Sequence, residues 1–168
     1  MRHTRTAAIL GATALLTLAG CSSGSSRDKV EDEPAAVRAS DAAGTFTALA
    51  AKIPTVKLGS VVTADTDPNR LLGRPGQYTS KVTFTDSRIK PTDTQGLKAG
   101  DVQLGGAIET FSSAGDAATR AQYIEAVTRS IPALAEYDYL HGTNVIRVSH
   151  YLTPVQAKEY ETAAAQLG

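Results

Sequence analysis

The fold class is determined by one hairpin sequence, Tyr137-Asp138-Tyr139-Leu140-His141-Gly142-Thr143-Asn144-Val145-Ile146-Arg147-Val148. Glycine at the first position of a two-residue loop is typical of a type II′ turn, and Gly142-Thr143 fits that turn. In this register Asp138 lies opposite Arg147, which predicts an ion pair on one face of the hairpin. Tyr139 lies opposite Ile146 on the other face. The stretch therefore predicts an antiparallel sheet.

Capping signals predict three helices around this hairpin. The first begins at Ser40 and stops before Pro54, and the second begins at Ser113, which has an acidic residue three positions later. The third begins with a capping box, Thr153-Pro154-Val155-Gln156, in which proline occupies the first helical position. This last helix is expected to run to about residue 166 and to bury Val155 in part.

Three further strands are predicted over 56–63, 77–85 and 102–111. In the second of them Tyr78, Val82 and Phe84 alternate with polar residues such as Lys81, which is the period of a half-buried strand. In the third, Gly105-Gly106 indicates a bend or a bulge.

The chain divides into three parts by composition. Residues 1–20 have the layout of a secretory signal, residues 21–40 are Ser-rich and then charged, as in a flexible tether, and residues 41–168 have the composition of a single globular domain. The element order is αβββαββα. With antiparallel neighbouring strands and helices packed on one face of the sheet, it predicts a two-layer α+β domain.

Cys21 is the single cysteine of the chain, and it ends the sequence Leu18-Ala19-Gly20-Cys21. An uncharged apolar run, 7–20, precedes it, and two arginines lie among the first six residues. This run is shorter than the roughly 20 residues that cross a bilayer as a helix. The arrangement resembles the signal peptide and lipobox of bacterial lipoproteins. The resemblance implies cleavage before Cys21, a diacylglycerol thioether on its sulfur, often an acylated amino group, and attachment to the lipid bilayer.

The charge balance argues against nucleic acid as a partner. The chain has 17 Lys and Arg residues against 17 Asp and Glu residues, so no basic excess is present to neutralise phosphates. Nor is there a polybasic segment that would give a second contact with the membrane.

Motifs that would identify a reaction are missing from the sequence. Neither a phosphate-binding glycine loop nor a zinc-protease or nucleophile-elbow motif occurs. His141 and His150 lie at opposite ends of the hairpin, too far apart to bind one metal ion. Asp65-Thr66-Asp67-Pro68-Asn69 begins like a calcium loop, but Arg70 and Gly76 occupy positions that require glycine and glutamate. We therefore expect no metal, no cofactor and no enzymatic activity. The residue counts do not exclude a catalytic Ser-His-Asp triad, so that alternative is kept.

The most distinctive stretch of the domain runs from Asp67 to Lys81 around a Gly-Pro-Gly turn. Arg70, Arg74, Gln77 and Lys81 are its candidate binding residues, because guanidinium groups on a rigid loop bind carboxylates and phosphates. The alternative is a structural connection in which two leucines pack into the core and the arginines are solvated.

Three stretches resemble a family of small lipoproteins from streptomycetes and related actinobacteria: DPNRLLGRPGQYTSK, EYDYLHG and TPVQAKEYE. The resemblance implies an uncharacterised cell-envelope lipoprotein on the outer, extracytoplasmic face of the cell membrane. Our leading expectation is a non-catalytic domain that binds a small ligand or an envelope protein. An inhibitor of a secreted hydrolase and an undetected enzyme are the alternatives.

Overall fold

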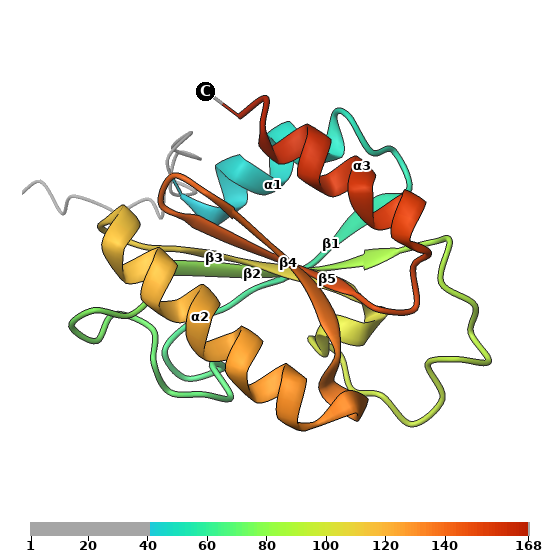
Figure 1. Ribbon diagram of the computed structural model, residues 1–168, viewed down its shortest axis with the longest axis horizontal. Coiled ribbons are helices and arrows are strands. Elements are labelled where there is room, and N and C mark those ends of the chain that lie inside the picture. The colour runs from blue at the N-terminus through green and yellow to red at the C-terminus, as the bar shows by residue number, and fades with distance from the viewer. Residues whose placement is uncertain (1–40, 168) are drawn as a thin grey trace, which may run out of the picture. The chain divides into compact units, whose positions relative to one another are not determined.

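The computed structural model describes residues 41–167, so Cys21, the lipobox and the whole of the predicted tether lie outside the described residues. The predicted α+β class, the element order and the antiparallel pairing are confirmed (Figure 1). The helices are α1 (Ala42–Ala50), α2 (Ala114–Ser130) and α3 (Pro154–Ala164), and the strands are β1 (Val56–Val61), β2 (Ser80–Asp86), β3 (Gly105–Thr110), β4 (Glu136–His141) and β5 (Asn144–Ser149). Two short 3₁₀ turns, η1 (Val102–Leu104) and η2 (Pro132–Leu134), precede β3 and β4. The strands form one sheet in the order β1-β2-β3-β5-β4.

The hairpin of β4 and β5 has the predicted register. Asp138 lies opposite Arg147 and Tyr139 lies opposite Ile146. Gly142 has φ +55°, whereas Thr143 does not have a positive φ. The turn therefore has a positive φ at its first central residue alone, as a type II′ turn does.

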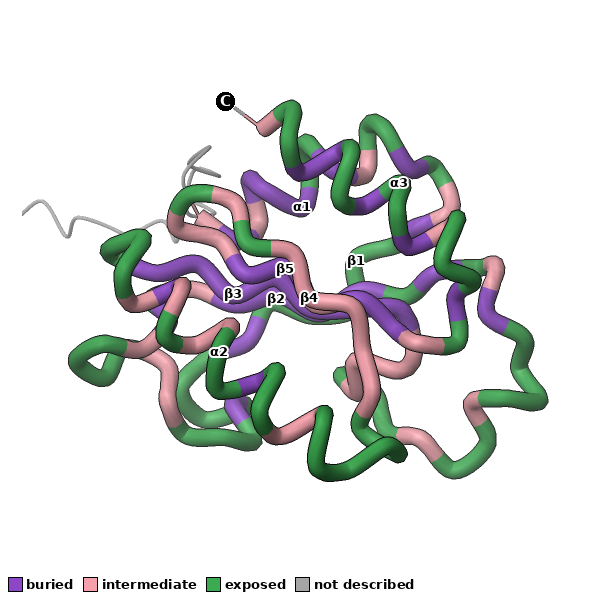
Figure 2. Tube along the Cα trace, viewed as in Figure 1, coloured by how far each residue is buried: buried purple, intermediate pink, exposed green. Residues whose placement is uncertain are grey.

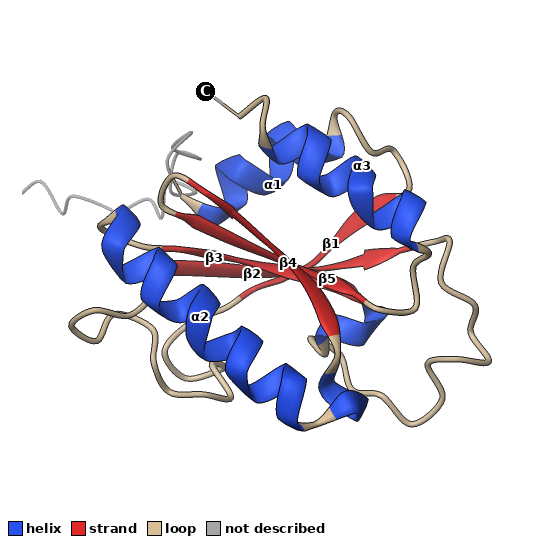
Figure 3. Cartoon of the chain, viewed as in Figure 1, coloured by secondary structure: helices blue, strands red, loops and turns tan. Residues whose placement is uncertain are grey.

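The prediction that the helices pack on one face of the sheet is wrong. Figures 1 and 3 show α1 and α3 on one side of the sheet and α2 on the other, so the domain has three layers. The reason is visible in β5, which has apolar residues on both faces of the sheet. Ile146 and Val148 belong to the core under α1 and α3, whereas Val145 belongs to the core under α2. The second core is small and consists of Tyr78, Phe111, Ala117, Ile124 and Val145.

The predicted helix starts are confirmed for two helices and are displaced by one residue for the first. The Ser113 hydroxyl accepts a hydrogen bond from the backbone of the residue three positions on, and the capping box of Thr153 and Gln156 is complete. α1 begins at Ala42 with Asp41 as its N-cap. Val155, expected to be partly buried, is 77% exposed. Within residues 41–167, none of the helices has both the length and the apolar content needed to cross a bilayer.

Gly105 and Gly106 do not mark a bulge. Both pair in register with β2, and the irregularity of the sheet lies in β1, between Leu58 and Ser60. A Cβ atom at Gly106 would lie 2.3 Å from Cζ of Phe84 and 2.3 Å from the carbonyl oxygen of Arg147. The glycine is therefore required because an aromatic ring and a backbone approach the strand closely.

β2 is buried on both faces, which a half-buried pattern does not predict. Val82 and Phe84 belong to the larger core, as expected, but Tyr78 precedes β2 and packs in the smaller core. Lys81, on the face toward α2, is 5% exposed. Figure 2 shows buried residues along the middle strands, between helices that are exposed on their outer sides. Charged side chains therefore lie between the sheet and α2.

Candidate functional site

A pocket of about 820 Å³ lies between the charged face of the sheet and α2. α2 packs on the sheet through its first half, by Ala117, Ala121 and Ile124, and in Figure 1 its C-terminal end lies away from β2 and β3. The pocket is lined by Asn69, Leu71, Gly76, Gln77, Asp101, Val102, Gln103, Thr119, Arg120, Tyr123, Ile124, Val127, Thr128, Leu134, Glu136 and Arg147. Its walls therefore come from the loop before β2, the η1 segment, α2, the η2 turn and the strands β4 and β5.

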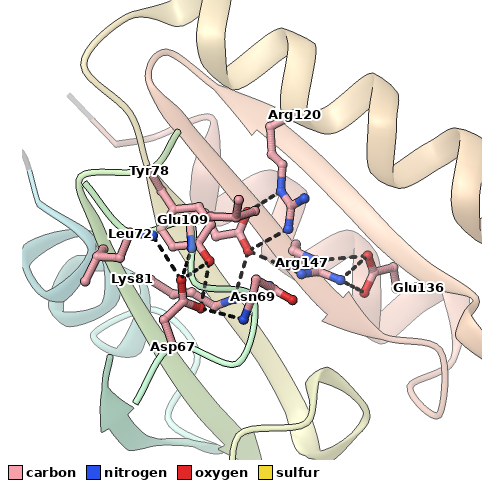
Figure 4. Close-up of polar contacts among 10 residues, drawn as sticks. Asp67, Asn69, Leu72, Tyr78, Lys81, Glu109, Arg120, Glu136 and Arg147 are labelled. Carbon is pink, nitrogen blue, oxygen red and sulfur yellow. Dashed lines mark hydrogen bonds and ion pairs between the residues drawn. The ribbon is translucent and has the colours of Figure 1, made fainter. Parts of the chain in front are cut away.

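The centre of the charged face is Glu109 on β3, whose side chain is fully buried. Three cations reach its carboxylate (Figure 4): Nζ of Lys81 at 3.0 Å, Nε of Arg120 at 2.8 Å and Nη1 of Arg147 at 3.3 Å. Burial by itself raises the pKa of Glu109, but the hydrogen bond from Arg120 and the charges of the other two cations lower it to about 2. Glu109 is therefore ionised, and its carboxylate holds the charged groups of Lys81, Arg120 and Arg147 in place.

Arg147 forms its strongest contact with Glu136 and not with the residue opposite it. Its Nε and Nη2 atoms donate to the two carboxylate oxygens of Glu136 at 2.9 and 3.0 Å. The predicted ion pair between Asp138 and Arg147 is thus wrong, although the register that suggested it is right. Burial and the charge of Glu136 raise the pKa of Asp138 to about 7, and its Oδ1 atom is buried without a hydrogen-bond partner among residues 41–167.

The loop before β2 is held by Asp67, which is 3% exposed. Its carboxylate accepts a hydrogen bond from the Tyr78 hydroxyl at 2.7 Å and from the backbone N–H groups of Asn69, Leu71 and Leu72 at 3.2, 2.7 and 3.0 Å. Burial raises the pKa of Asp67, but these donors outweigh it and the pKa falls below its usual value. Hydrogen bonds from within the domain therefore fix the shape of the loop that resembles the start of a calcium site. Asn69, Leu71, Gly76 and Gln77 of this loop line the pocket.

The structure separates the four candidate binding residues of this stretch. Gln77 lines the pocket, and Lys81 lies in the ion cluster beneath it. Arg70 and Arg74 are exposed and are not among the described residues that line the pocket. Leu71 packs against the smaller core, which is what the structural alternative predicts for the leucines of this loop.

Both histidines of the hairpin contact backbone carbonyl groups at opposite ends of β4 and β5. His141 Nε2 lies 2.8 Å from the carbonyl oxygen of Leu167, and His150 Nδ1 lies 2.7 Å from that of Ala135. Within residues 41–167 no group of three or more His, Cys, Asp and Glu side chains is placed to hold a metal ion.

Sequence reasoning did not identify Glu109, Arg120, Glu136 and Arg147 as parts of one site. A signal was present for one pair, because Lys81 and Glu109 are direct cross-strand neighbours in β2 and β3. Charged residues at matching positions of two adjacent strands indicate a polar face, but the pairing of β2 with β3 had to be known first. Arg120 comes from α2, whose side of the sheet was predicted wrongly.

The arrangement can bind a small molecule that has both polar and apolar parts, because a charged floor and an apolar wall meet in one pocket. Comparison of the chain with models of known protein families, with curated proteins and with solved structures finds no match in any of the three.

Proposed function

We propose that the protein is a cell-envelope lipoprotein, anchored through Cys21, whose folded domain binds a small ligand without catalysing a reaction. The pocket between α2 and the charged sheet face carries the second half of this proposal. Its volume of about 820 Å³ lies in the range of roughly 300–1,000 Å³ that is usual for small-molecule sites.

The walls of the pocket support binding, because they are already fixed by contacts within the chain. Asp67 holds the loop, and the Glu109 cluster holds Arg120 and Arg147. Preorganised walls reduce the entropy lost on binding.

The ion pairs also favour binding over catalysis. The oxygens of Glu109 and Glu136 accept hydrogen bonds from Arg120, Arg147 and Lys81, so these carboxylates are held in ion pairs. A general base needs an oxygen that can reach a substrate proton.

Ligand binding can be tested with the segment 41–168, which holds both cores and all three helices within one compact unit and is therefore expected to fold by itself. A library of small organic fragments is titrated while the amide resonances are followed by NMR. We expect shifts at pocket residues such as Gln103 and Tyr123.

A matched pair of variants locates the binding. Thr119→Trp fills the pocket, whereas Thr162→Trp fills the smaller hollow beside α3. The two variants are matched because each threonine hydroxyl donates to the helix carbonyl four residues earlier, at 2.9 and 3.0 Å. Loss of the shifts in the first variant alone supports the proposal. Shifts that persist in Thr119→Trp, or a pocket that no fragment perturbs, contradict it.

Anchoring rests on the sequence Leu18-Ala19-Gly20-Cys21 and has its own test. Cys21→Ser removes the thiol that would carry the lipid, so the protein should leave the membrane fraction or stay unprocessed. Membrane retention together with normal processing in this variant argues against lipidation.

A second candidate function, inhibition of a secreted hydrolase, is favoured by the loop that carries Arg70 and Arg74. Arg70 has φ +53°, a conformation that non-glycine residues rarely adopt, and the bonds to Asp67 hold the loop in that shape. A rigid exposed loop is what an inhibitor presents to an enzyme cleft. If this function is right, added protein lowers hydrolase activity in culture supernatant and Arg74→Glu abolishes the effect; unchanged activity rejects it.

A further inference from the structure

We propose that the pocket between α2 and the sheet takes an amphiphilic anion, with its acidic group on Arg120 and its apolar body against Tyr123 and Leu134. This inference rests on the proposed binding function and names the chemical class of the ligand.

The first argument is the distribution of charge beneath the pocket. Lys81, Arg120 and Arg147 all contact Glu109, which supplies one negative charge. Arg147 has a second carboxylate partner, Glu136, at 2.8 Å. Lys81 and Arg120 therefore share one carboxylate, that of Glu109, as their salt-bridge partner.

Other acidic groups lie near the pocket, and within residues 41–167 none of them forms a salt bridge with Arg120 or Lys81. Asp67 is buried in the loop before β2, where its carboxylate accepts hydrogen bonds from the Tyr78 hydroxyl and from three backbone N–H groups. Asp101 lines the rim, where its carboxylate accepts the backbone N–H of Lys98 at 2.7 Å. Asp138 lies on β4, two residues from Glu136 and opposite Arg147. The carboxylates of Asp67, Asp101 and Asp138 thus have other surroundings, and within residues 41–167 Glu109 is the one carboxylate that pairs with Arg120.

The second argument is that Arg120 has unused donors. Its Nε and Nη2 atoms donate to Glu109 at 2.8 and 3.3 Å, whereas Nη1 has no hydrogen-bond partner among residues 41–167. Arg120 lines the pocket and its side chain is 10% exposed, so we infer that the two N–H groups of Nη1 can donate to a ligand there. A guanidinium group that is held in place on one side and free on the other can donate to a carboxylate, sulfonate or phosphate.

The third argument is the apolar surface beside this guanidinium group. Tyr123 and Leu134 are 60% and 42% exposed and line the same pocket, and the Arg120 guanidinium carbon lies 5.5 Å from the centre of the Tyr123 ring. Exposed large apolar side chains that gather at a pocket mark a binding surface. A small inorganic anion would leave them in water, whereas an acid with an aromatic or branched body would cover them.

The test compares three probes of nearly equal shape on the segment 41–168: 2-naphthoate, its neutral carboxamide and the cationic 2-naphthylmethylamine. Dissociation constants are measured by NMR titration at low salt and at 0.5 M NaCl. We expect 2-naphthoate to bind at least tenfold more tightly than the amide, to shift Tyr123 and the Arg120 side chain, and to weaken with salt.

Variants then assign the contact to Arg120. Arg120→Gln should weaken 2-naphthoate binding at least tenfold and leave amide binding within twofold of the wild type. Arg129→Gln is the matched control, because Arg129 is an exposed arginine of the same helix that pairs with Glu125. Arg120→Lys keeps the charge beside Glu109 and guards against loss of folding; it should retain the preference for the acid and lose part of the affinity.

Each outcome bears on the proposal. Amide or amine binding as tight as that of 2-naphthoate overturns the inference, as does an equal effect of Arg120→Gln and Arg129→Gln. If none of these probes shifts the pocket while library fragments do, the anion class is wrong and the binding function stands. If neither probes nor fragments shift it, both are wrong.

Discussion

Replacing Asp138 by asparagine should stabilise the domain at neutral pH. The carboxyl group of Asp138 lies between β4 and α2, where burial and the charge of Glu136 raise its pKa to about 7 from an ordinary value of 3.8. Its Oδ1 atom is buried without a partner among the described residues. An asparagine side chain at this position would have nearly the same shape and no charge, so the variant removes the cost of ionisation alone.

The magnitude follows from the two pKa values. The pKa is higher in the folded protein than in the unfolded chain, so the contribution of Asp138 to stability is complete below pH 3.8 and is lost as the pH rises to about 7. The loss is about 1.4 kcal/mol for each pH unit between these values, which sets an upper limit of about 4 kcal/mol. The pKa of about 7 already includes the attraction of Arg147, and burying the amide of asparagine has a cost of its own, so we expect a gain of about 1–3 kcal/mol at pH 8.

Urea unfolding of the segment 41–168, followed by circular dichroism between pH 4 and pH 8, measures this effect. The free energy of unfolding of Asp138→Asn minus that of the wild type should be near zero at pH 4, rise toward pH 7 and then stay level. Asp65→Asn, an exposed change in a loop, is the control and should shift stability by less than about 0.5 kcal/mol at every pH. A difference for Asp138→Asn that is independent of pH, or negative at pH 8, would refute the reasoning.

Three further changes test the packing. Gly106→Ala places a Cβ atom 2.3 Å from a backbone oxygen and should lower the free energy of unfolding in urea by about 3 kcal/mol or more. Gly115→Ala in α2 is the control: its Cβ atom would lie 3.8 Å from the nearest neighbouring side-chain atom, so the change should be neutral or stabilise the domain by up to about 1 kcal/mol. Tyr160→Phe removes the hydroxyl that donates to buried Asp86 at 2.6 Å, and thermal unfolding should show a loss of about 1.5–3 kcal/mol. Asp67→Asn weakens the bonds that hold the pocket loop and should cost about 1–3 kcal/mol, with faster hydrogen exchange at the loop amides than in the wild type.

Much of the secondary structure could be predicted because its signals are local. The capping box at Thr153 and the Ser113 cap act within four residues, and the glycine of the Gly142-Thr143 turn sets the hairpin register. The exposure of Val155 was not predictable in the same way, since it depends on how α3 is rotated against the sheet. Local signals therefore define each element, and packing defines its orientation.

The side of the sheet that α2 covers depends on contacts between distant residues. Alternation in β2 shows which residues share a face, yet it does not show whether the second face is covered. Lys81 could equally be solvated, and only the neighbours Glu109 and Arg120, 28 and 39 positions away, make it a buried residue. The candidate site was missed for this reason: its residues come from four strands and a helix.

The composition of the covered face argues that α2 does more than shield the sheet. Burying a charged group costs several kcal/mol, which a good ion pair roughly offsets, and apolar residues of the same size would stabilise such a layer as well or better. The layer beneath α1 and α3 has a large apolar core with one buried carboxylate, Asp86, whereas the layer beneath α2 combines a small apolar cluster with Lys81, Glu109, Arg120 and Arg147. These charged residues adjoin the pocket, and the apolar cluster holds the first half of α2. An apolar cluster under one end of a helix and charged residues beside the other end are expected where the first end is fixed to a sheet and the second forms a wall of a binding site.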